Sequence, residues 1–144
     1  MRDAARPAPG DMPGADPFAD APMTAAELLT VSEWLGLTQR DLAAILGVNE
    51  RTLRGYVSGR YPIPDWLPGE VERIEAFTAA AVGQVVAALG DMRDPAVVVY
   101  RRDEELWGER PEFAPYPARW WRMVVARAAS EVPGVVIEYA PARA

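Results

Sequence analysis

The sequence contains no cysteine, no histidine and no lysine. Without cysteine the chain can form neither a disulfide framework nor a thiolate nucleophile. Without histidine it also lacks the usual zinc ligands and every nucleophile that depends on a neighbouring imidazole. These absences remove most common enzyme mechanisms. We therefore predict a protein that is not an enzyme, with no catalytic residue, no bound metal and no cofactor.

Long apolar stretches are missing as well. No apolar run reaches the roughly 18 residues of a membrane span, and the N-terminal region lacks the apolar core of a signal peptide. We therefore expect a cytoplasmic protein. Half of the 144 residues are apolar, which suits one domain or two small ones. All 15 basic residues are arginine, and alanine and proline are abundant, as in proteins from GC-rich bacterial genomes.

Residues 1–22 are rich in Ala, Pro, Gly and Asp, with Phe18 as the only aromatic residue. Such a segment buries too little apolar surface to offset its ordering entropy, so we predict a disordered leader. There are two alternatives to a disordered leader. Met23 could be the natural start, or the region around Phe18 could bind a partner.

Residues 37–64 carry the most informative pattern, which predicts two short helices joined by a tight turn. Thr38 can cap the first helix with Asp41 in its first turn, and Gly47 can end it. Asn49 can cap the second helix, which stops at Gly59, before two prolines. The predicted buried residues of the pair are Leu42, Ala43, Ile45, Leu46, Leu53, Tyr56 and Val57.

The string from Thr38 to Gly59, T-Q-x-x-L-A-x-x-L-G-V-x-x-x-T-L-x-x-Y-x-x-G, resembles the helix-turn-helix of phage-repressor and Cro-like regulators. The positions that carry the resemblance are Ala43, Gly47, Val48, Leu53, Tyr56 and Gly59. It implies a lambda-repressor-like helical bundle whose second helix enters the major groove of double-stranded DNA. The alternative is a helical hairpin that only packs against its neighbours.

The resemblance also implies which residues contact DNA. Arg51 and Arg54 are candidates for guanine, and Glu50 for cytosine. Gly55 occupies a further base-contact position but lacks the side chain that other members carry there. The predicted phosphate contacts are Gln39, Arg40, Asn49, Thr52, Ser58 and Arg60.

Charge is distributed unevenly along the chain. The net charge is −6, which by itself argues against nucleic-acid binding. Residues 38–60 nevertheless hold four arginines against two acidic residues, whereas residues 1–22 hold two arginines against four aspartates. We therefore expect a locally basic face on an acidic protein, with binding that is sensitive to salt.

The flanking segments predict more helices and one small strand unit. Thr24 and Glu27 form a capping-box pattern before a helix that we expect to pack through Leu28, Val31 and Leu35, with Trp34 in the core. Residues 70–89 form a long helix, either packed on the first domain or used as a subunit contact.

The C-terminal part adds strands at 96–100 and 135–139, a helical turn at 103–107 and a helix at 117–132. In that last helix we place Trp120, Val124, Val125 and Ala128 inward and Arg119, Arg122 and Arg127 toward solvent.

The fold class is therefore mainly α, with a helix-turn-helix bundle followed by a small α+β strand–helix–strand unit. We divide the chain into the leader (1–22), the DNA-binding domain with its long helix (23–90) and the α+β unit (91–144). Two strands are too few to stand alone and leave open edges, so we expect dimerisation through the last unit.

The order of parts also resembles the anti-CRISPR-associated autorepressors and the related YdiL-type proteins. The resemblance rests on residues 56–64, on Tyr100 after the valine-rich strand and on the helix with Trp120 and Trp121. It implies a homodimer that represses its own operon from a two-fold operator, with half-sites about 34 Å apart.

Two other functions are compatible with the sequence. An antitoxin would combine the same DNA-binding fold with a C-terminal unit that binds a toxin. A metal-dependent enzyme would need a cation at the acidic residues that follow the first predicted strand, although their spacing is not that of a calcium-binding loop. Those acidic residues are Asp103, Glu104, Glu105, Glu109 and Glu112.

Overall fold

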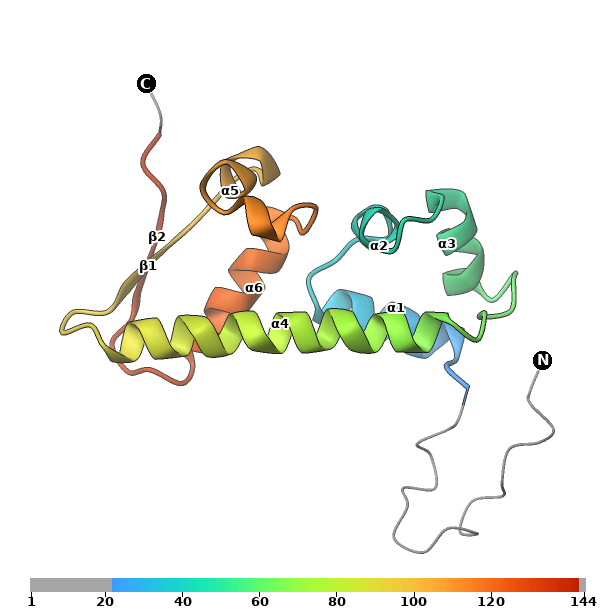
Figure 1. Cartoon of the computed structure of the whole chain (residues 1–144), viewed down its shortest axis with the longest axis horizontal. Helices are drawn as coiled ribbons and strands as arrows, with labels where there is room; N and C mark the ends of the chain where they lie inside the picture. The colour runs from blue at the N-terminus through green and yellow to red at the C-terminus, as the bar shows by residue number, and fades with distance from the viewer. Residues whose placement is uncertain (1–21, 143–144) are drawn as a thin grey trace, which may run out of the picture.

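The computed structural model describes residues 22–142, and Figure 1 shows how they are arranged around the long helix α4 (Leu67–Gly90). The predicted class, a mainly helical protein with a small two-stranded C-terminal sheet, is confirmed. The predicted leader lies outside the described residues, except for Pro22. The elements are α1 (Ala25–Trp34), α2 (Gln39–Leu46), α3 (Glu50–Ser58), α4, β1 (Ala96–Val99), α5 (Asp103–Glu109), the 3-10 helix η1 (Pro111–Phe113), α6 (Ala118–Ala129) and β2 (Val136–Tyr139).

The first two helices begin at the predicted caps, and both caps are capping boxes. Thr24 Oγ1 accepts a hydrogen bond from the Glu27 amide at 3.0 Å, and Glu27 Oε1 accepts one from the Thr24 amide at 2.8 Å. Thr38 and Asp41 repeat this exchange at the start of α2. Each pair satisfies backbone N–H groups that have no partner inside the helix. Gly47 then ends α2 with φ of 71°, a left-handed conformation that favours glycine.

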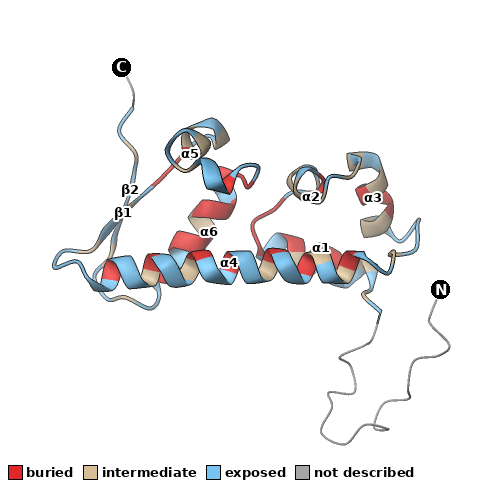
Figure 2. Cartoon of the chain, viewed as in Figure 1, coloured by how far each residue is buried: buried red, intermediate tan, exposed pale blue. Residues whose placement is uncertain are grey.

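Helix α4 carries one buried stripe along its whole length. Its 24 residues span about 36 Å at 1.5 Å per residue. The buried positions recur every three or four residues, so they lie on one side of the helix: Leu67, Val71, Ile74, Thr78, Ala81, Val85 and Leu89. Figure 2 shows these buried segments alternating with exposed ones. No helix within residues 22–142 is long and apolar enough to cross a membrane.

Both halves of the chain pack on this stripe. Figure 1 places α1, α2 and α3 along one half of α4 and α5, α6 and the strands along the other. The two groups also meet directly, because Gly36 between α1 and α2 lies against the backbone of Arg119 and Trp120 in α6. The buried apolar residues form a single cluster. The sequence analysis divided the chain into two parts at residue 90, but the buried core of the structure includes residues from both parts.

The centre of the C-terminal half is aromatic. Trp120 is fully buried, and its indole Nε1 donates a hydrogen bond to Thr78 Oγ1 on α4 at 3.0 Å. Phe77, also on α4, stacks on Tyr116 with ring centroids 4.8 Å apart. Phe113 from η1 contacts the Trp120 ring edge-on at 5.1 Å. These contacts attach α6 firmly to α4, and the residues predicted to face inward on α6 are all buried.

The two strands pair in parallel, with Val97 opposite Ile137. The outer edge of β1 is covered by α6, because Trp121 Nε1 donates to the Val98 carbonyl at 3.0 Å and Arg122 donates to the Tyr100 carbonyl. All four residues of β2, in contrast, are exposed. Within the described residues, the sheet therefore has one covered edge and one open edge.

Three side chains are placed differently from the sequence predictions. Trp34 is 57% exposed, so its placement in the core was wrong. The buried side of α1 runs through Leu28, Ser32 and Leu35, and Trp34 lies beside that stripe with the guanidinium of Arg127 3.5 Å above its ring. Arg127 and Arg122 are only partly exposed, because each also donates to a backbone carbonyl, whereas Arg119 faces solvent as expected.

Replacing Thr78 with valine tests the hydrogen bond at the centre of the core. Valine keeps the shape but leaves the buried indole N–H of Trp120 without its acceptor, so we expect a loss of about 1–3 kcal/mol in unfolding free energy. Thr30→Val is the matched control. Thr30 makes the same type of bond to the carbonyl four residues earlier but is exposed, so its loss should stay below about 0.5 kcal/mol. Urea unfolding measures both, and equal losses would contradict the prediction.

Stability should also fall in alkaline solution because of Tyr116. Burial raises the pKa of its phenol from 10.0 to about 12. Between these two values the unfolded chain ionises this group while the folded chain keeps it neutral, so unfolding becomes more favourable as pH rises. The contribution is fully present below pH 10. We expect the melting temperature to decline from pH 10 to 12, and Tyr116→Phe to reduce that decline. An unchanged decline in the variant would exclude Tyr116 as its source.

Candidate nucleic-acid interface

Helix α3 has one buried face and one exposed, arginine-bearing face. Leu53 is fully buried, and α3 packs against α1 and α2 through this side. Arg51 and Arg54 lie on the exposed side. Asn49 sets the start of the helix, because its Oδ1 accepts a hydrogen bond from the Arg51 amide at 2.8 Å. The arginine face is therefore presented on a short helix that is anchored along its opposite side.

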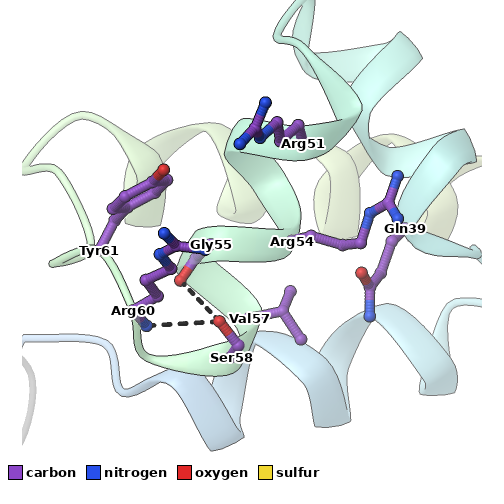
Figure 3. Close-up of a pocket in the computed structure, with 8 residues that line it drawn as sticks. All are labelled: Gln39, Arg51, Arg54, Gly55, Val57, Ser58, Arg60 and Tyr61. Carbon is purple, nitrogen blue, oxygen red and sulfur yellow. Dashed lines mark hydrogen bonds between the residues drawn. The ribbon is translucent and has the colours of Figure 1, made fainter.

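A shallow hollow of about 590 Å³ runs beside this exposed face. Figure 3 shows Arg54 extending toward Gln39 on one side of α3, and Tyr61 and Arg60 on the other. Three guanidinium groups reach the hollow, and none of its lining residues is acidic. The lining residues are Gln39, Arg51, Arg54, Gly55, Val57, Ser58, Arg60 and Tyr61. Such a surface suits an anionic ligand, since guanidinium groups bind phosphate and planar acceptors with paired hydrogen bonds.

The two arginines of α3 differ in their partners. Arg54 forms an ion pair with Glu50 at 3.0 Å, with side chains 62% and 43% exposed. Arg51 makes no ion pair within residues 22–142. An exposed pair of this kind contributes at most about 1 kcal/mol, so Arg54 can exchange Glu50 for another acceptor at little cost.

The hollow contains some of the predicted contact residues and not others. Gln39, Ser58 and Arg60 lie in it together with the arginines of α3, while Glu50 borders it through its ion pair. The Ser58 hydroxyl already donates to the Gly55 carbonyl at 3.2 Å. The remaining predicted phosphate contacts do not line the hollow: Arg40, Asn49 and Thr52.

Gly55 is buried, although the resemblance placed it at a base-contact position. The ring of Tyr61 lies over it, so closely that a Cβ at position 55 would be only 2.1 Å from Tyr61 Cδ2. Tyr61 therefore occupies the space that a side chain at 55 would fill. Our sequence reasoning missed Tyr61. A signal was present, because glycine inside a helix is unfavourable and often marks the close approach of another group.

Three of the five acidic residues considered for a cation form hydrogen bonds or ion pairs within the chain. Asp103 Oδ1 accepts from the Ala118 amide at 2.8 Å, and Glu105 Oε1 accepts from the Arg102 amide at 3.0 Å. Glu112 pairs with Arg110, whose hydrogen bond lowers the pKa of this exposed carboxyl. No group of three or more potential ligands for a metal ion occurs in the described part of the chain. Asp103 and Glu105 thus bind amides at the starts of helices, and Glu112 pairs with arginine.

No protein-family model matches the chain, and no curated protein is significantly similar to it.

Proposed function

We propose that this protein is a sequence-specific DNA-binding regulator of transcription, a dimeric repressor that reads a two-fold operator through α3. The observation that carries the proposal is the orientation of α3. Its apolar side is buried, and Arg51 and Arg54 project from its exposed side. If these arginines had been packed inside the protein, α3 could not read DNA.

The size and chemistry of α3 suit the major groove, which admits a single α-helix. In helix-turn-helix proteins, the N-terminal half of the second helix meets the base edges. Arg51 stands in the first turn of α3 and is the best candidate for guanine O6 and N7. Arg54, one turn further along, can exchange its exposed pair with Glu50 for a second base or a phosphate.

Phosphate contacts would flank the helix on both sides. Gln39 is the first residue of α2, where free backbone N–H groups and the helix dipole favour an anion. Arg60 lies beyond the other end of α3 and reaches the same hollow. In this arrangement Gln39 and Arg60 would hold the DNA backbone on either side while α3 reads the groove. The acidic remainder of the chain keeps nonspecific binding weak.

The open edge of β2 supports a homodimer. A two-stranded sheet is at best marginally stable, and an exposed edge is a template for another strand. Trp121 and Arg122 already donate to carbonyls along the β1 edge, so β2 is the more accessible edge for a further strand. Antiparallel pairing of β2 with its own copy would create a four-stranded sheet about a two-fold axis, as a closed dimer requires.

A toxin partner is the second candidate, and the same observation favours it. The exposed apolar residues Val136, Ile137 and Tyr139 would serve a heterologous strand as well as a second copy. The oligomeric state separates the two functions. A chain that is monomeric alone but pairs with the product of a neighbouring gene would be an antitoxin.

Selection of bound fragments from random duplex DNA tests the main proposal. The wild type should select a two-fold sequence, and Arg51→Ala should lose about 1–3 kcal/mol, with relaxed preference at one base pair per half-site. Arg73→Ala is the matched control, since its side chain is 80% exposed on α4, outside the hollow. Equal loss on every DNA sequence would reduce Arg51 to a backbone contact, and no selected sequence would refute the function.

Sedimentation velocity tests the dimer. The wild type should be dimeric at micromolar concentration, and Ile137→Lys should be monomeric because two like charges would face each other near the two-fold axis. Leu29→Lys provides the control, as Leu29 is a similarly exposed apolar residue on α1, and this variant should remain dimeric. A monomeric wild type, both with and without its selected DNA, would rule out the homodimer.

A further inference from the structure

We infer that Tyr61 is a specificity-determining residue, whose ring reads the methyl group of a thymine next to the base pair contacted by Arg51. The inference rests on the proposed function and assigns a base contact to a residue that is not part of α3. It explains why position 55, in the middle of that helix, is glycine.

The position of Tyr61 depends on Gly55. Any larger residue at 55 would place its Cβ 2.1 Å from Cδ2 and 2.3 Å from Cε2 of the ring. These distances are far shorter than van der Waals contact, so the ring could not remain there. Arg51 and Gly55 are four residues apart and share one face of α3. The ring over Gly55 therefore extends the Arg51 face by one turn.

The loop after α3 holds Tyr61 in this place. Gly59 turns the chain back with φ of 82°, and the Tyr61 amide then donates to the Gly55 carbonyl at 3.0 Å. Tyr56 contacts the ring edge-on, with centroids 6.4 Å apart. Pro62 follows and restricts the backbone of Tyr61 to extended conformations. The side chain is thus largely ordered before any ligand binds, which lowers the entropic cost of a contact.

Tyr61 keeps a surface for DNA despite these contacts. It is 38% exposed and lines the same hollow as Arg51, Arg54 and Arg60. Figure 3 shows its ring beside α3, on the flank opposite Arg54. The exposed part of an aromatic ring is mainly apolar, and the apolar feature of the major groove is the thymine C5 methyl group. An aromatic contact from this position would therefore select thymine.

The test compares selected sites and single-atom changes in the DNA. Fragments are selected with the full-length wild type, Tyr61→Ala, Tyr61→Phe and Gly55→Ala. We expect Tyr61→Ala to lose a thymine preference at one position while the guanine assigned to Arg51 is retained. Tyr61→Phe should keep the thymine. Gly55→Ala should reproduce the Tyr61→Ala site, since its methyl group displaces the ring, and the double variant should be no weaker than Tyr61→Ala.

Replacing the selected thymine with uracil tests the contact without changing the protein. The wild type should bind the uracil site about fourfold more weakly, the effect of one buried methyl group. Tyr61→Ala should bind thymine and uracil sites equally, with circular dichroism confirming that it is folded. If the wild type does not distinguish uracil from thymine, or if Tyr61→Ala weakens all sequences equally, the inference is wrong while the proposed function stands. If the wild type selects no sequence, both fail.

Discussion

The structure depends on the burial of one stripe of α4. From Leu67 to Leu89 this stripe supplies apolar surface to both ends of the molecule. Neither end has a sufficient core of its own: three short helices pack at one end, and two strands with two helices at the other. The hydrogen bond from Trp120 to Thr78 places a polar pair in the middle of this contact. Because a buried polar group without a partner is costly, this pair favours the alignment of α6 on α4 in which the hydrogen bond forms. The stripe thus joins the two halves of the chain through one continuous hydrophobic core.

The exposed face of α3 depends on the packing of the N-terminal helices. The helix has only nine residues and would not be stable alone. Packing of Leu53 against α1 and α2 holds it, and the cap at Asn49 and the turn at Gly59 determine its ends. The exposed side is then free to carry charge. A protein with a net charge of −6 can present a basic surface because three arginines converge on one hollow whose lining contains no carboxylate.

The two edges of the small sheet differ in how accessible they are to a strand from another chain. Side chains of α6 donate hydrogen bonds to the Val98 and Tyr100 carbonyls along the β1 edge, which hinders the addition of a further strand there. The outward groups of β2 have no such cover within residues 22–142, and its side chains are exposed. Within residues 22–142, β2 therefore offers the more open edge for strand addition. In the function that we propose, this site would join two copies, and their α3 helices would face two half-sites.

The sequence by itself determined the local features of this protein. The caps at Thr24 and Thr38, the left-handed Gly47 and the long helix over residues 70–89 all arise between residues close along the chain, and each was predicted. Only the tertiary structure decided the rest. Trp34 is exposed beside the buried stripe of α1, and Tyr61 folds back onto Gly55. Such placements depend on which distant segments meet, and neither helical periodicity nor spacing carries that information.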